Sequence, residues 1–170
     1  MKVLVLNCGS STLKFQLIEA STEGTASAAV RPLARGRVDR IGGGDSTLAL
    51  EMDGTAAQKE PSRARNHEEA VRAIIALLKS DSKLDAFNVV AHRVVHGGDR
   101  FRSAVLIDDS VMDALEILRE LAPLHNPPSL AGIRAARSDI GKTMPMVAVF
   151  DTSFHRTIPE SAATYAIPHE

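Results

Sequence analysis

The chain begins with MKVLVLNCGSSTLKFQL, residues 1–17, and this stretch predicts a β-hairpin. Residues 3–6 form a continuous apolar run with two valines, which is typical of a buried strand. Residues 8–12 are small and include Gly9, as expected for a turn. Phe15 and Leu17 then alternate with polar neighbours, which indicates a second strand. We therefore expect two strands joined by a glycine-containing turn.

Beyond this hairpin, the sequence predicts two more strands and then an alternation of helices and strands. Strands are expected at residues 31–41 and 47–52, with a glycine turn at 42–44 between them, and later at 87–91 and 146–150. The polar stretches 21–29 and 53–65 have the composition of surface connections. This order is typical of a mixed α/β domain with hairpins at one end.

The first predicted helix has a clear start and a clear buried face. Asn66 is a good N-cap, and Glu69 follows three residues later, as in a capping box. Apolar residues then recur at helical spacing, namely Val71, Ile74, Ile75 and Leu78. We expect these side chains to pack against the sheet.

Two further helices are expected downstream. Ser110 is predicted to cap the second, which would bury Leu115, Leu118 and Ala122. Asn126 is predicted to cap the third, because Pro127 then falls in the first turn, where its missing N–H would have no partner anyway.

Composition and charge exclude several classes of protein. With 170 residues, 44 % of them hydrophobic and 24 % charged, the chain has the make-up of an ordinary soluble domain. A formal net charge of −1 argues against nucleic acid as the main partner, because phosphate backbones are bound by a clustered basic excess. The single cysteine, Cys8, excludes a disulfide within the chain. No apolar run is long enough for a signal peptide or a bilayer span, so we expect a cytoplasmic protein without a membrane partner.

The turn between the first two strands carries groups that suit phosphate. Backbone N–H groups in such a turn can face an anion, the hydroxyls of Ser10 and Thr12 add donors, and Lys14 adds a positive charge. Asn7, at the end of the first strand, is placed to hold a metal-bound water or a phosphate oxygen. The alternative is a plain hairpin turn with polar residues, since the segment lacks the glycine–lysine–hydroxyl run of a P-loop.

A second candidate segment is AHRVVHGG, residues 91–98. On a strand, side chains alternate, so His92 and His96 share one face while Arg93 and Val95 share the other. An arginine beside a valine suits a short carboxylate, because the guanidinium binds the oxygens and the valine contacts the alkyl group. The alternative for Arg93 is a surface salt bridge. The two histidines are four residues apart, a metal-ligand spacing that works on a helix, so we interpret both as structural.

Two more residues are candidates for the same chemistry. His125 precedes a predicted helix start, where the positive end of the helix dipole favours anions, so its ring is placed to donate to a phosphoryl group. Asp151 follows the apolar strand, a common position for a catalytic or metal-organising carboxylate. The alternatives are a loop histidine with no role and an aspartate that caps a turn. Taken together, the candidates supply the positioning and charge stabilisation that phosphoryl transfer requires.

Four segments of the chain resemble, in order, signature segments of the acetate kinase family. They are LVLNCGSSTLK, AHRVVHGGDRF, LAPLHNPP and VFDTSFHRTIP. The resemblance runs from Met1 to about Pro168, and propionate and butyrate kinases share these segments. It implies an actin-like, ribonuclease H-like α/β fold with two related domains around a cleft. It also implies a homodimeric enzyme that moves phosphate from ATP to acetate with Mg²⁺, giving acetyl phosphate and ADP.

The resemblance assigns roles to the residues that would meet the substrate. Arg93 would bind the carboxylate, and Val95 and Leu124 would line the methyl pocket. His125 would hydrogen-bond the transferring phosphoryl group. Asp151 would act as an acid–base or magnesium-organising carboxylate, and we favour the second role, because a carboxylate substrate with a pKa of about 4–5 is already ionised at neutral pH.

The same resemblance assigns the nucleotide and metal side of the site. Asn7 would help to position Mg²⁺, and Lys14 would contact the phosphates of ATP. Ser10 and Thr12 would line the phosphate turn. Thr12 stands where the family usually has a third serine, and because the hydroxyl is kept we expect its role to be kept.

The resemblance also indicates which part of the enzyme residues 1–170 represent. The family continues with a nucleotide-binding half, so we expect these residues to form the N-terminal domain, with half an active site and little kinase turnover alone. The alternative is a non-catalytic domain that binds a carboxylate, phosphate or a partner protein. In an N-terminal domain alone, the face that lines the cleft would lack its partner domain. We therefore expect that face to be apolar and the domain to self-associate in solution.

Overall fold

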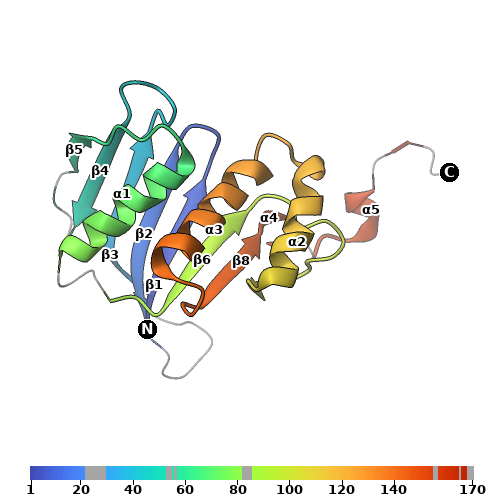
Figure 1. Ribbon diagram of the computed structural model, residues 1–170. Helices are drawn as coiled ribbons and strands as arrows, with labels where there is room; N and C mark the ends of the chain where they lie inside the picture. Colours follow the sequence, from blue (N-terminus) through green and yellow to red (C-terminus); the bar gives the residue numbers. More distant parts are fainter. Residues whose placement is uncertain are drawn as a thin grey trace.

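An eight-stranded mixed sheet with strand order β5-β4-β3-β2-β1-β6-β8-β7 organises the chain (Figure 1). The computed structural model describes residues 1–21, 30–52, 55, 57–81, 86–154, 157–164 and 166–167. The strands are β1 (Lys2–Cys8), β2 (Leu13–Ala20), β3 (Val30–Asp39), β4 (Thr47–Met52), β5 (Gln58–Pro61), β6 (Val89–Val94), β7 (Val105–Leu106) and β8 (Met146–Phe150). The helices are α1 (His67–Ser80), α2 (Asp109–Ile117), the 3-10 helix η1 (Leu118–Leu121), α3 (Asn126–Ile140), α4 (Asp151–Phe154) and α5 (Glu160–Ala163). None of the helices described here combines the length and the apolar character that a membrane span needs.

The sheet divides at β1 into an antiparallel part and a parallel part. β1 to β5 are antiparallel neighbours in sequence order, beginning with the expected hairpin, in which Leu6 lies opposite Phe15. β6 pairs in parallel with both β1 and β8, whereas the short β7 runs antiparallel to β8. Because β1, β6 and β8 run in one direction, their carboxyl ends meet at one edge of the sheet, where α/β proteins gather their ligands.

α1 and α3 lie side by side over one face of the sheet (Figure 1). Alternation along β1 explains which face they cover, since Leu4, Leu6 and Cys8 are buried while the residues between them are only half-buried. On α1 the buried residues are Ala70, Val71, Ile74, Ile75 and Leu78, which include all four that the sequence predicts. The mixed α/β fold expected from the sequence is therefore confirmed.

α3 approaches β1 closely because residue 132 has no side chain. A Cβ at Gly132 would overlap the Sγ of Cys8. Cys8 is itself 5 % exposed, and burial raises the pKa of its thiol to about 12, so the sulfur stays a neutral packing group. The glycine is thus required by packing between a helix and a strand.

The start of α1 follows the sequence prediction in part. Asn66 caps the helix, because its Oδ1 accepts the N–H of Glu69 at 2.8 Å. The carboxylate of Glu69 accepts the N–H of Arg65 at 2.9 Å, one residue before the cap, so the reciprocal half of the expected capping box is shifted.

The predicted caps of α2 and α3 are wrong. Asp108 caps α2, since its carboxylate accepts the N–H of Val111 at 2.8 Å, and the hydroxyl of Ser110 donates to the same carboxylate. At α3, His125 occupies the cap position without a side-chain bond, and Asn126 is the first helical residue. The side chain of Asn126 is buried and bonds elsewhere, so it is unavailable as a cap.

Two connections also differ from the prediction. Residues 58–61, expected in a surface connection, form the edge strand β5, and all four are exposed. An edge strand pairs on one side only, so its side chains need no apolar alternation that the sequence could reveal. The second helix ends at Ile117, which leaves Leu118 in η1 and Ala122 beyond it. The connection expected at 21–29 lies, apart from its first residue, outside the described residues.

Candidate functional site

The carboxyl ends of β1, β6 and β8 bring three predicted site residues together. Nε of Arg93 donates to Oδ1 of Asp151 at 2.8 Å, and Nη2 donates to Oδ2 at 2.6 Å. Nη1 donates to Oδ1 of Asn7 at 3.1 Å. The register explains the meeting, because Arg93 lies opposite Val149 of β8, two residues before Asp151. One guanidinium therefore joins three strand ends.

The pair of Arg93 and Asp151 is open to solvent, with side chains 47 % and 37 % exposed. Its hydrogen bonds to Asp151 are the main cause that raises the pKa of Arg93, which stays charged. In this structure the guanidinium makes the ion pair that was the alternative to carboxylate binding. So exposed a pair contributes little stability, and an incoming carboxylate can replace it. Carboxylate binding by Arg93 stays a prediction.

The β1–β2 turn forms one wall of a polar hollow beside Arg93. The N–H of Gly9 donates to the carbonyl of Thr12 at 2.8 Å, which closes the turn. The hollow has a volume of about 410 Å³, and it is lined by residues 9–12 together with Asn7, Lys14, Arg37, Asp39 and Arg93. Cationic side chains outnumber carboxylates in this lining, which favours an anion. The turn residues predicted to bind phosphate thus share one hollow with the predicted carboxylate-binding arginine.

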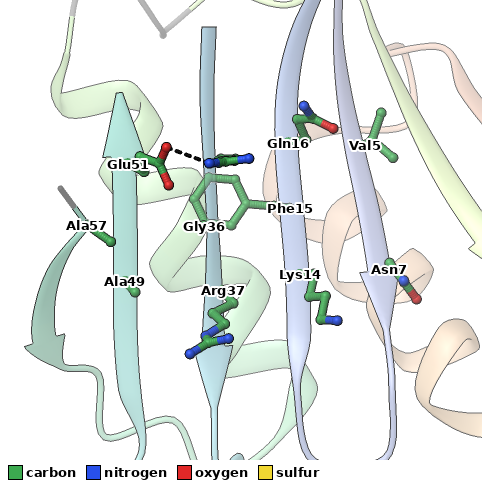
Figure 2. Close-up of a pocket in the computed structure, with 11 residues that line it drawn as sticks. Val5, Asn7, Lys14, Phe15, Gln16, Gly36, Arg37, Ala49, Glu51 and Ala57 are labelled. Atoms are coloured by element: carbon green, nitrogen blue, oxygen red, sulfur yellow. Dashed lines mark hydrogen bonds and ion pairs between the residues drawn. The ribbon is translucent and has the colours of Figure 1, made fainter. Parts of the chain in front are cut away.

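A second hollow continues from the turn along the sheet (Figure 2). It has a volume of about 610 Å³, lies over β1 to β4, and shares Asn7, Lys14 and Arg37 with the first. Beneath the hollow, the ring of the buried Phe15 packs against Gly36, where an added Cβ would meet it at 2.6 Å. The ammonium of Lys14 makes no ion pair or hydrogen bond within the described part of the chain, so its charge is available to a ligand.

The remaining predicted residues lie at the start of α3 and just past β6. His125 is exposed at the N-cap position of α3, as expected for a ring at the positive end of a helix dipole. Leu124 is 74 % exposed, and Val95 is half-buried. Among the described residues, no hydrogen bond or ion pair joins these three side chains to Arg93 or Asp151. The predicted site therefore has one part assembled at the strand ends and another on the neighbouring segments.

Two residues that the sequence did not indicate as part of the site connect its strand-end part with the part on the neighbouring segments. The side chain of Asn126, 1 % exposed, accepts the N–H of His96 at 3.2 Å and donates to the carbonyls of His96 at 3.1 Å and Leu118 at 2.9 Å. The hydroxyl of Thr152 accepts the N–H of Gly97 at 3.1 Å. Each of the two follows a predicted catalytic residue directly, so the backbone at 96–97 links both catalytic segments. The available signal, an asparagine before a proline, indicated a helix cap instead.

The histidines interpreted as structural occupy structural positions. His92 is 2 % exposed, and burial lowers its pKa to about 3, so its ring is neutral at physiological pH. Its Nε2 is buried and has no hydrogen-bond partner among the residues that the structure describes. Nδ1 of His96 accepts the N–H of Gly98 at 2.9 Å. Over the described ranges, no three His, Cys, Asp or Glu side chains gather as a metal site.

The oxygen atoms around Arg93 nevertheless suit a hard cation. Oδ1 of Asn7 and the carboxylate of Asp151 converge on one positive group, so both face a place where positive charge is stabilised. Mg²⁺ commonly binds through one or two carboxylates plus substrate phosphates, and it retains several waters. The residues present therefore fit Mg²⁺, without a larger cage of protein ligands.

Residues 2–170 match the model of one protein family, the acetokinase family. The chain belongs to that family. Acetate kinases of Clostridium beijerinckii and Lachnoclostridium phytofermentans are 43 % and 46 % identical to it over 175 residues. Each alignment covers 100 % of this chain but 42 % of the relative, so the chain spans less than half the length of these relatives.

Solved structures of the family share the fold. The crystal structure of Porphyromonas gingivalis acetate kinase matches with a TM-score of 0.82 at 37 % identity, over 99 % of this chain and 41 % of that protein. A propionate kinase from Francisella tularensis matches with a TM-score of 0.82 at 33 % identity and the same coverage. The actin-like fold implied by the sequence resemblance is thereby confirmed.

Proposed function

We propose that residues 1–170 form the carboxylate- and phosphoryl-binding domain of an acetate kinase, which transfers phosphate between ATP and acetate. The meeting of Asn7, Arg93 and Asp151 at three strand ends, beside the β1–β2 turn, carries this proposal. A guanidinium and a polar turn around one hollow suit the carboxylate and the phosphoryl group that must react together. The names of the relatives support the same assignment.

In the proposed reaction, a carboxylate oxygen of the substrate attacks the γ-phosphorus of ATP in line, and the bond from that phosphorus to the bridging oxygen of ADP breaks. No general base is needed, because a pKa of about 4–5 leaves the carboxylate ionised at neutral pH. Arg93 holds the carboxylate, and His125 donates to a phosphoryl oxygen, so both offset the negative charge of the transition state. Val95 and Leu124 contact the alkyl group.

The turn and the strand-end oxygens serve the nucleotide in this proposal. Ser10, Thr12 and Lys14 bind phosphate oxygens of ATP. Mg²⁺, held near Asn7 and Asp151, supplies charge neutralisation on the phosphates when it is bound. The incoming substrate replaces Asp151 on the guanidinium, which frees the carboxylate of Asp151 to organise the cation.

The features of the whole enzyme belong to the same proposal. We propose that residues 1–170 form the N-terminal domain and supply half of the active site, because relatives of more than twice this length carry the name. We also propose that the whole enzyme is a cytoplasmic homodimer, as the resemblance of the sequence to the family implies. Residues 1–170 alone are then expected to give little kinase turnover. Ordinary acetate-kinase rates from this chain in a coupled assay would contradict that expectation.

Calorimetric titration with acetate and acetyl phosphate tests the proposed site. We expect Arg93→Ala to weaken acetate binding by about tenfold or more, since a charge-assisted bidentate contact is lost. Arg119→Ala is the matched control, because Arg119 is an exposed arginine in an ion pair with Glu116. Equal acetate affinity in both variants would overturn the role of Arg93. Tight binding of an unrelated ligand would favour a non-catalytic binding domain.

The length of the acceptor is tested in the same titration. Acetate is proposed because the curated relatives are acetate kinases, yet a propionate kinase has the same fold. Tighter binding of propionate or butyrate than of acetate would reassign the acceptor and leave the site unchanged.

A further inference from the structure

Three backbone carbonyls of the β1–β2 turn, residues 9–12, accept hydrogen bonds from other groups of the protein. Nε2 of His67, the first residue of α1, lies 2.6 Å from the carbonyl oxygen of Gly9. The N–H of Ile41 donates to the carbonyl of Ser11 at 2.9 Å, and the carbonyl of Thr12 accepts the N–H that closes the turn. Because a carbonyl only accepts, Nε2 of His67 carries the hydrogen in its contact.

These contacts set the direction of the N–H groups of the turn. In a trans peptide, a C=O and the N–H of the next residue point in opposite directions. The bond from His67 to Gly9 therefore turns the N–H of Ser10 away from α1, and the bond to Ser11 directs the N–H of Thr12 in the same manner. Within the described part of the chain, neither N–H has a hydrogen-bond partner. Both residues line the polar hollow beside the strand ends.

From this geometry we infer that His67 is a positioning residue for the β1–β2 turn, which is proposed to bind phosphate. It acts through the backbone, by presenting the N–H of Ser10 to an anion before the anion arrives. Donors fixed in advance cost no reorganisation on binding, so their loss weakens affinity even where the fold is intact. The inference rests on the proposed function, in which the turn binds phosphoryl oxygens.

A purely structural role for His67 predicts a different result. A hydrogen bond that only tied α1 to the hairpin would stabilise the fold and leave the anion affinity unchanged. α1 is already anchored by Val71, Ile74 and Leu78, each 0 % exposed. Stability and anion affinity therefore separate the two roles.

Sulfate is the probe, because it remains a tetrahedral dianion over the working pH range. An NMR titration follows the backbone amide signals of residues 10–12 in the wild type, in His67→Phe and in His67→Gln. Phenylalanine keeps a flat ring without a donor, whereas glutamine offers an N–H at similar reach. We expect His67→Phe to bind sulfate about fivefold to tenfold more weakly, the effect of one hydrogen bond, and His67→Gln to recover much of that loss.

Glu68→Gln is the matched control, since Glu68 is the adjacent first-turn residue and is exposed. Its effect on sulfate affinity should stay below about twofold. Thermal melts verify that each variant is folded, and if His67→Phe is not, His67→Asn replaces it, because its amide is too short to reach Gly9. If sulfate shifts no amide signal of residues 10–12 in the wild type, the proposal that this turn binds phosphate is overturned. Equal affinity in the wild type and the folded donor-less variant would overturn only the role of His67.

Discussion

Acid should destabilise this fold through one buried histidine. His92 is 2 % exposed, and burial lowers its pKa from 6.5 to about 3. In the unfolded chain the ring regains its ordinary pKa, so between these two values the unfolded state binds a proton that the folded state does not. The free energy of unfolding therefore falls as the pH drops below 6.5, and the loss is complete near the folded pKa of about 3.

The size of the effect follows from the two pKa values. Between about pH 7.5 and about pH 5, the linkage removes about 2 kcal/mol from the free energy of unfolding. That is a large share of the roughly 5–15 kcal/mol typical of a domain. Carboxylates such as Glu51 and Glu69, whose pKa values are lowered chiefly by hydrogen bonds to arginines, lose their contribution below their ordinary pKa of 4.5. The window above about pH 5 therefore isolates the histidine.

Urea unfolding followed by circular dichroism, at several pH values across this window, measures the effect. The comparison protein is His92→Leu, which has similar volume, does not titrate, and removes the buried Nε2 that lacks a partner in the described part of the chain. The other histidines among the six are common to both proteins, so they cancel in the difference. We expect the wild type to lose about 2 kcal/mol more than the variant. Parallel losses in the two proteins would refute the reasoning.

Three other outcomes are expected from the packing and the surface. Gly132→Ala should lower the free energy of unfolding by about 1–3 kcal/mol in urea titrations, because the new Cβ overlaps the Sγ of Cys8. Adding Cys8→Ala should restore most of the loss, and a failure to do so would contradict the contact. Asn126→Ala should cost about 2–4 kcal/mol, because three part-buried backbone groups lose their bonds, whereas Ser129→Ala, which removes one bond in the same helix, should cost less. Light scattering should detect self-association, because Leu106, Leu124 and Phe154 are each more than two-thirds exposed, and a strictly monomeric profile at all concentrations would count against this.

Apolar periodicity predicts those elements that bury one face, and little else. The predictions at 47–52 and 146–150 coincide with β4 and β8, because side chains that are half-buried in β4 and alternately buried in β8 leave an apolar signature. β5 leaves none, since its pairing uses backbone groups while its side chains stay exposed. The start of α2 shows a second limit. Asp108 and Ser110 are both good caps, and only the folded geometry decides which side chain reaches the N–H of Val111.

The candidate site, too, can be predicted from the sequence only in part. The positions of Asn7 and Asp151 at strand ends follow from the sequence pattern alone. That Arg93 bonds to both follows from the parallel order of β1, β6 and β8, which the pattern leaves open. His67 contacts a backbone carbonyl 58 residues away, at Gly9, and no spacing rule reaches that far.

The two outer strands of the sheet affect what kind of assembly this chain can form. β5 is four residues long, carries exposed Lys59 and Glu60, and ends at Pro61, while β7 at the opposite side has two residues. Long, uncharged outer strands recruit the strands of other molecules and can seed fibrils, whereas brevity, charge and proline oppose this. Molecules of this chain that meet through apolar faces should therefore stop at discrete oligomers, without growing into cross-β filaments.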